Sequence, residues 1–116
     1  DVVSGARARL GTPMALDLGG RGVRSIDLVG TTYYIVAGPI GDEGSFALYR
    51  WSGAAAEAPL PMAVDLGTLR PEALLAIPDT NDLMLLSDDG GVLVDGKPCK
   101  DLRASQQTFR TITIPR

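Results

Sequence analysis

The sequence predicts an all-β fold built from two related units, on three observations. The segment from Pro13 to Gly19 returns as Pro61 to Gly67, displaced by 48 residues (61 − 13), with only Leu16 and Val64 differing. A period between roughly 40 and 50 residues is typical of propeller blades and related arrays. Apolar residues alternate or run in short blocks, and Gly and Pro separate these blocks. We therefore expect two propeller-blade-like antiparallel sheets, as in a fragment of a β-propeller.

The first unit, residues 13–60 of a single domain spanning 1–116, is expected to hold four short strands. Their predicted ranges are Met14 to Leu18, Ser25 to Val29, Thr32 to Ala37 and Phe46 to Trp51. The first range puts Met and two Leu on one face and Ala and Asp on the other, which is typical of a half-buried strand. Gly30-Thr31 is a turn signal, so the second and third strands should form a hairpin.

The second unit, residues 61–116, repeats this order. Its predicted strands are Met62 to Leu66, Ala73 to Ile77, Leu83 to Ser87 and Thr108 to Ile114, with an extra short strand over Val92 to Asp95. The 48-residue displacement aligns Ile26 with Leu74, and one inserted residue then aligns Tyr34 with Leu83. Helical signals are nearly absent: Ala54 to Ala58 is too short to be a stable helix, and Ser105 to Gln107 could make one turn.

Composition narrows the classes of function. The chain has 116 residues, 45% of them hydrophobic, with a net charge of −3 and an estimated pI of 4.7. An acidic chain lacks the basic face that phosphate binding requires, so nucleic acid is not expected as a partner. No apolar run approaches the roughly 18 residues of a membrane span. We expect a soluble protein that does not bind a membrane, with the cytoplasm and the periplasm both open.

The chain contains no histidine and one cysteine, Cys99. This excludes Ser-His-Asp and Cys-His catalysis, histidine-ligated zinc and an intrachain disulfide. Lys97 and Lys100 flank Cys99 and could favour its thiolate. The preferred interpretation is an incidental cysteine at the surface or half-buried.

Acidic loops are the candidate metal sites. Asp42, Glu72, Asp88 and Asp89 lie in or beside breaker-rich segments. Calcium prefers oxygen ligands from carboxylates and loop carbonyls, so it is the candidate ion. The competing interpretation, which we favour, is ordinary turn chemistry, in which Asp accepts hydrogen bonds from nearby backbone N–H groups. No other cofactor is indicated.

Arg24 and Glu72 occupy equivalent positions in the two units, at the start of a predicted strand in each. Neighbouring blades lie side by side, so an ion pair between them is expected. If it is buried and has supporting hydrogen bonds, such a pair would fix the position of one unit relative to the other more than it would add stability. The functional alternative is that Arg24 binds an anion. Trp51 and the tyrosines are expected to pack in the core.

Several motifs together resemble a known family. They are Gly22-Val23-Arg24-Ser25-Ile26, Ala37-Gly38-Pro39, Phe46-Ala47-Leu48-Tyr49-Arg50-Trp51, Pro71-Glu72-Ala73-Leu74 and Leu85-Leu86-Ser87-Asp88-Asp89-Gly90. In these the chain resembles the uncharacterised bacterial proteins filed as domain of unknown function 3616, which are longer and look like β-propellers. The resemblance implies that this chain corresponds to their C-terminal blades. Glu72 and the Ser-Asp-Asp pattern are more loosely similar to esterase-like phytase propellers, a likeness that concerns fold alone.

Two functions remain open on the sequence, and whether the chain is an enzyme is undecided. One is a non-enzymatic propeller-type scaffold or binding fragment of an uncharacterised bacterial protein. The other is a fragment of a calcium-assisted phosphoesterase or hydrolase of the phytase-like propeller type. Two blades leave sheet edges open, and open edges invite pairing. We therefore expect self-association through those edges, or pairing with the missing blades of a parent chain.

Overall fold

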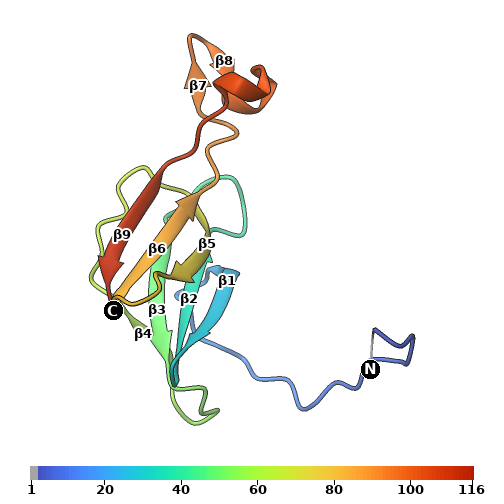
Figure 1. Ribbon diagram of the computed structural model, residues 1–116. Helices are drawn as coiled ribbons and strands as arrows, with labels where there is room; N and C mark the ends of the chain where they lie inside the picture. Colours follow the sequence, from blue (N-terminus) through green and yellow to red (C-terminus); the bar gives the residue numbers. More distant parts are fainter. Residues whose placement is uncertain (1–2) are drawn as a thin grey trace.

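The computed structural model describes residues 3–116 and confirms an all-β protein with antiparallel sheets (Figure 1). Sheet A contains, in spatial order, β1 (Gly22–Val29), β2 (Thr32–Gly38), β3 (Ala47–Trp51) and β4 (Leu60–Pro61). Sheet B contains β5 (Pro71–Ala76), β6 (Asp82–Ser87) and β9 (Thr111–Pro115). Both sheets are open, with edge strands at their sides.

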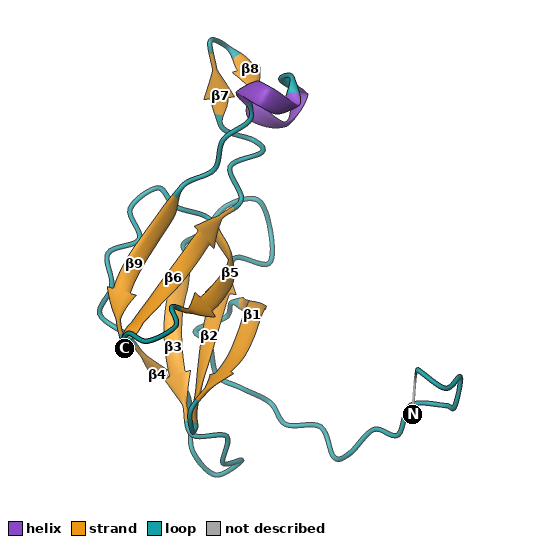
Figure 2. Ribbon diagram, in the orientation of Figure 1, coloured by secondary structure: helices purple, strands orange, loops and turns teal. Residues whose placement is uncertain are grey.

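Residues 90–109 form a small separate lobe that stands away from both sheets (Figure 1). It contains the hairpin of β7 (Leu93–Val94) and β8 (Lys97–Pro98), followed by the 3₁₀ turns η1 (Cys99–Asp101) and η2 (Ala104–Gln106). These turns are the helical elements of residues 3–116 (Figure 2), and no helix there is long and apolar enough to cross a membrane. The predicted strand beside Asp95 and the predicted turn at Ser105 are both present. Cys99 is buried in the lobe, so its expected surface or half-buried position was wrong.

The two long hairpins have different loops. In sheet A, Val29 pairs directly with Thr32, which leaves the two-residue turn Gly30-Thr31. Gly30 has φ +63°, a left-handed conformation that glycine adopts without strain. In sheet B, the Ile77 N–H donates to the Asp82 carbonyl at 3.0 Å, so the loop there has four residues, 78–81.

The difference in loop length also appears in the strand pairing of the two sheets. Ile26 pairs with Ile35, and Leu74 pairs with Leu85. Ile26 and Leu74 are 48 residues apart, as aligned from the sequence, but Ile35 and Leu85 are 50 apart (85 − 35). The predicted offset of 49 for this strand was wrong by one residue, because the longer loop contributes two extra residues.

Both first strands carry an irregularity at the same place. The pairing of β1 with β2 shifts register between Val23 and Ser25, and that of β5 with β6 shifts between Pro71 and Ala73. A bulge of this kind leaves one residue unpaired and bends the strand. The unpaired residues are Arg24 and Glu72.

The predicted strands over Met14 to Leu18 and Met62 to Leu66 do not form. Both segments lie outside the sheets. Their burial alternates as expected from Leu16 to Leu18 and from Met62 to Leu66, whereas Met14, predicted on the covered face, is 54% exposed. Alternation shows which side of a chain is covered, whereas a strand also needs a hydrogen-bonding neighbour along its length.

The two segments end in the same turn. The Gly19 N–H donates to Asp17 Oδ1 at 3.0 Å, and the Gly67 N–H donates to Asp65 Oδ1 at 2.9 Å. Both glycines have positive φ, +65° and +51°. The aspartates therefore serve as turn residues, in the way that Asp side chains commonly do.

The main core lies between the two sheets. Sheet A contributes Tyr34, Val36 and Leu48, and sheet B contributes Leu74, Leu83, Leu85 and Ile114. The opposite face of sheet A holds a second cluster, formed by Leu18, Ile35, Ala37, Tyr49 and Trp51. Because β2 is covered on both faces, its apolar run is continuous.

The apolar runs of the sequence predict burial at six strand positions, Ile35, Val36, Leu48, Leu74, Leu85 and Leu86, and this is confirmed for five of them. Ile35, Val36, Leu48, Leu74 and Leu85 are all at most 5% exposed. Leu86 is half-buried, because it lies on the outer face of sheet B. The aromatic residues also pack as expected: the Tyr33 and Trp51 ring centroids lie 5.5 Å apart.

Candidate functional site

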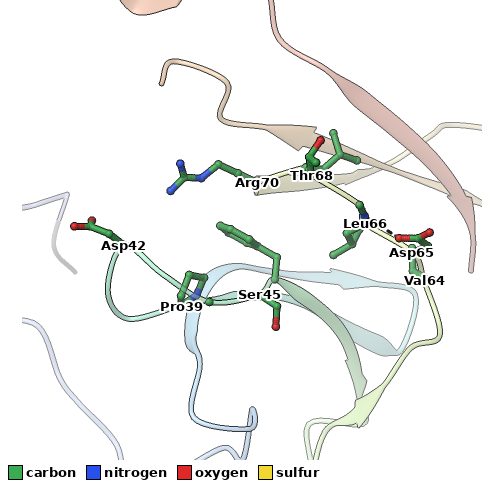
Figure 3. A pocket seen from close by; sticks show the side chains of 12 residues that line it. Pro39, Asp42, Ser45, Val64, Asp65, Leu66, Thr68 and Arg70 are labelled. Carbon is green, nitrogen blue, oxygen red and sulfur yellow. Dashed lines mark hydrogen bonds between the residues drawn. The ribbon is translucent and has the colours of Figure 1, made fainter. Parts of the chain in front are cut away.

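A cleft opens between the two sheets, where the loop from Pro39 to Phe46 meets residues 64–70. Its volume of about 400 Å³ lies within the range of small-ligand pockets. Figure 3 shows Arg70 extending across its mouth toward the side on which Asp42 lies, with Pro39 and Leu66 along its walls. A cation, a carboxylate and an apolar lining therefore surround one opening.

Arg24 fixes one wall of the cleft. Its Nη1 lies 3.4 Å from Glu72 Oε1, which confirms the predicted ion pair. Its Nη2 donates to the Pro39 carbonyl at 2.6 Å, and its guanidinium carbon lies 5.9 Å from the centroid of the Phe46 ring. Through these contacts Arg24 joins the two bulges to the loop that lines the cleft.

Gly38 permits this packing. A Cβ at this position would lie 2.6 Å from Phe46 Cε1 and 2.8 Å from Arg24 Nε, so these side chains would have to move to make room for it. Its cross-strand neighbour Gly22 has open space around it. Gly38 is thus needed for the close approach of Arg24 and Phe46 to the backbone.

A second polar cluster, the Asp89 clasp, consists of Thr68, Ser87, Asp89 and Arg110. Arg110 Nε donates to Asp89 Oδ2 and its Nη2 donates to Asp89 Oδ1, both at 2.9 Å. The Ser87 hydroxyl donates to Asp89 Oδ1 at 2.7 Å, and Arg110 Nη1 donates to Thr68 Oγ1 at 2.8 Å. The clasp closes the base of the lobe and holds segment 68–70, which borders the cleft.

The electrostatics of the clasp follow from these hydrogen bonds. The Arg110 side chain holds the pKa of Asp89 well below its ordinary value, and burial of the carboxyl opposes this effect only in part. The Ser87 hydroxyl and the Arg110 backbone N–H lower the Asp89 pKa further. Asp89 in turn raises the pKa of Arg110. Asp89 is therefore an ionised carboxylate with all its near partners inside the fold.

The structure separates the four carboxylates proposed to bind calcium. Asp42 lines the cleft, Glu72 pairs with Arg24, Asp89 belongs to the clasp, and Asp88 Oδ1 accepts the Gly90 N–H at 3.0 Å. Among residues 3–116, no group of three or more His, Cys, Asp or Glu side chains is arranged to hold a metal ion. Calcium binding at these residues, like anion binding by Arg24, stays a prediction.

Sequence reasoning missed Arg70 and Arg110. Arg110 stands immediately before the β-branched run of β9, but its partner Asp89 lies 21 residues earlier, across the lobe. Arg70 precedes Pro71 at the start of β5. Its place beside the cleft becomes apparent only in the folded chain. Neither residue belongs to a short motif that could have indicated its contacts.

The chain is thus an all-β protein of two stacked antiparallel sheets, with a cleft between them. The family described as protein of unknown function (DUF3616) matches residues 6–87, which include β1 to β6 and the whole lining of the cleft. The chain belongs to this family, as its motifs indicated. No curated protein and no solved structure matches the chain.

Proposed function

We propose that this chain is a non-enzymatic scaffold of the β-propeller type that binds or assembles through its sheet faces and the loops around its cleft. One observation carries the proposal. Ile26 and Leu74 each lie two residues after a bulge, on the same face of the first strand of their sheets. Leu74 is 5% exposed because sheet A covers it, whereas Ile26 is 47% exposed.

The order of packing supports this proposal. Leu16 and Leu18 lie against the Ile35 face of sheet A, and Val64 and Leu66 belong to the cluster on the Leu85 face of sheet B. Each segment therefore lies on the same side of the sheet that follows it. Units that stack in one direction in this way are the basis of repeat proteins and propellers.

The cleft supplies the second binding surface in the proposal. The guanidinium of Arg70 and the carboxylate of Asp42 have no hydrogen bond or ion pair with any residue in the described part of the chain. Both are exposed, on loops held by packed strands. Loops that a rigid framework holds in place commonly carry binding residues.

The calcium-assisted hydrolase is the competing function. It would require Asp42, Glu72, Asp88 and Asp89 to share an ion and Arg24 to meet an anionic substrate. Glu72 instead forms an ion pair with Arg24, and Asp89 forms one with Arg110. These contacts within the fold support the scaffold.

The test measures thermal stability and hydrolysis with millimolar calcium. A ligand that binds only the native state raises the melting temperature as its concentration rises. We expect no rise and no hydrolysis of p-nitrophenyl phosphate. A rise that Asp42→Asn abolishes, and that the lobe control Asp95→Asn retains, would overturn the proposal, as would calcium-dependent hydrolysis.

A further inference from the structure

We propose that the edge of β9 accepts residues 12–14 of a second copy of this chain as a fourth strand, so that copies stack with sheet B of one against sheet A of the next. This inference rests on the proposed scaffold function and names its partner. Within one chain, sheet A packs against sheet B and the segment that connects them pairs with the edge of sheet A. We apply the same arrangement between sheet B of one copy and sheet A of the next.

The template is the pairing of β4 with β3 inside one chain. Arg50 pairs with Leu60 and Tyr49 pairs with Pro61, and the Met62 N–H donates to the Leu48 carbonyl at 2.8 Å. Hydrogen-bonded and non-hydrogen-bonded pairs alternate along an antiparallel ladder. Pro61 therefore occupies a position whose N–H is not needed, which is where an edge strand can hold proline.

β9 is the counterpart of β3, and it lacks a fourth strand. Ile112 pairs with Leu85 as Tyr49 pairs with Ile35. Since the Ser87 N–H donates to the Arg110 carbonyl, alternate residues of β9 bond to β6, and Thr111 and Thr113 direct their backbone groups outward. β9 is the edge of sheet B, so no strand of residues 3–116 takes up these groups.

Residues 12–14 are the counterpart of residues 60–62. Pro13 and Met14 stand 48 residues before Pro61 and Met62 (61 − 13), at the start of the duplicated segment. They lie in an extended arm that leaves the sheets (Figure 1). Leu10 is 92% exposed and Met14 is 54% exposed, a costly arrangement for large apolar side chains.

The same placement would cover two apolar faces. The outer face of sheet A exposes a row on β1, with Val23 at 49%, Ile26 at 47% and Leu28 at 56%. The outer face of sheet B carries Met84 and Leu86, which pair in register as Tyr34 and Val36 do in sheet A. Tyr34 and Val36 belong to the buried cluster that contains Leu74 within the chain. The outer face of sheet B in one copy could therefore cover Ile26 of the next copy, in the way that sheet A covers Leu74 within a chain.

The register of the intermolecular pair is specific. Thr12 should lie opposite Thr113 and Pro13 opposite Ile112, and the Met14 N–H should donate to the Thr111 carbonyl. The two ends of a chain use different surfaces, so the contact is head-to-tail and can add further copies.

Cross-linking tests the register. Thr12→Cys and Thr113→Cys are placed on separate chains, each with Cys99→Ala, and mixed with a short bis-maleimide. We expect a cross-linked pair only in the mixture. The matched control replaces Thr113→Cys with Thr31→Cys, at the far hairpin turn, and should give none. Equal cross-linking to both positions would overturn the proposal. If Cys99→Ala does not fold, the native chain, in which Cys99 is buried, replaces it as background.

Light scattering tests the association. The native chain should exceed the monomer mass at micromolar concentration, and Leu28→Lys should weaken association roughly tenfold or more, since each 1.4 kcal/mol is a factor of ten. Leu93→Lys, at a lobe residue that is 65% exposed, should leave it unchanged. A native chain that remains a monomer would overturn self-association while leaving the calcium and hydrolysis test to decide the scaffold function.

Discussion

Sheets A and B begin alike and differ in what covers them. The first strand of each sheet contains a bulge. Each sheet is also covered on one face by a segment that ends in a turn closed by an Asp side chain, Asp17 for sheet A and Asp65 for sheet B. Ile26 and Leu74 occupy matching places in these strands, yet Ile26 is 47% exposed and Leu74 only 5%. Whether a sheet face is buried therefore depends on the layer that packs on it. The strand's own sequence only makes that face apolar.

The sheets also differ where their central strands end. After β2 the chain forms an open loop that lines the cleft, held by the contacts of Arg24. After β6 it enters the Asp89 clasp, in which a buried carboxylate meets a bidentate guanidinium. The first end is accessible to a ligand, and the second is closed by its own polar network.

The largest expected difference is between Leu74→Ala and Ile26→Ala. Leu74→Ala should lower the free energy of unfolding by about 2–5 kcal/mol, because it leaves a cavity between the sheets. Ile26→Ala should cost less than about 1 kcal/mol, because its side chain is already half in water. Urea titrations of the monomer measure both. Equal losses would mean that the two faces are covered alike.

The clasp should contribute next. Asp89→Ala removes hydrogen bonds from a charged group and leaves Ser87 without its acceptor, at a cost of about 1.5–3 kcal/mol. The neighbouring Asp88→Ala, at an exposed residue that accepts a single turn hydrogen bond, is the matched control and should cost less. Comparable losses in urea titrations would show that the buried network adds nothing to sheet B.

The clasp also predicts a pH dependence. The pKa of Asp89 is lower in the folded than in the unfolded chain, so its contribution to stability is present above the unfolded value, about 3.9. It is lost as pH falls through the folded pKa. The stability difference between the native chain and Asp89→Asn should therefore be constant near neutrality and shrink below about pH 4. A difference that persists in acid would contradict the ionised clasp.

Gly22 and Gly38 are cross-strand partners, and substitution should affect them differently. Gly38→Ala should cost about 1 kcal/mol or more, because the new methyl group would overlap Phe46 and Arg24. Gly22→Ala, directly across the ladder and in open space, should be neutral or slightly stabilising. The melting temperatures of the two variants measure the difference. An unchanged melting temperature for Gly38→Ala would show that Phe46 and Arg24 can move without loss of stability.

The smallest effect is expected at the ion pair between the bulges. The side chains of Arg24 and Glu72 are 33% and 38% exposed, and pairs in such positions contribute about 0–1 kcal/mol. Glu72→Gln should therefore cost little, and less at high salt. Glu43→Gln, at an exposed loop residue, is the control. A large, salt-independent loss at Glu72 would mean that the pair holds the sheets together.

The sequence predicted the parts of the fold that depend on local signals. The turn at Gly30-Thr31, the β-branched run after it and the ion pair from matching positions are all present. The strand predicted over Met14 to Leu18 was wrong, because alternation reports burial without a hydrogen-bonding partner. The offset in β6 was one residue short, because loop length does not follow from strand pattern.

The candidate site was less predictable for a physical reason. The cleft lies between loops that come together only when the sheets stack, so Arg70 and Asp42 meet across its mouth without any sequence signal. Asp89 was singled out as a metal ligand, but its partner Arg110 returns to it only after the lobe. Two residues that meet across an inserted segment have no characteristic spacing in the sequence, so their contact cannot be predicted from a motif.

The clasp lies where the chain enters and leaves the lobe. Ser87 and Arg110 are bonded neighbours at the end of the β6–β9 ladder, so the whole lobe occupies the place of a hairpin turn. The match to the family ends at Ser87, the last residue before this detour. Because Asp89 and Arg110 lock the two stems of the lobe together, we expect residues 90–109 to tolerate changes in length or sequence as long as Ser87, Asp89 and Arg110 are kept. The lobe is thus a natural site for grafting new sequence onto an unchanged framework.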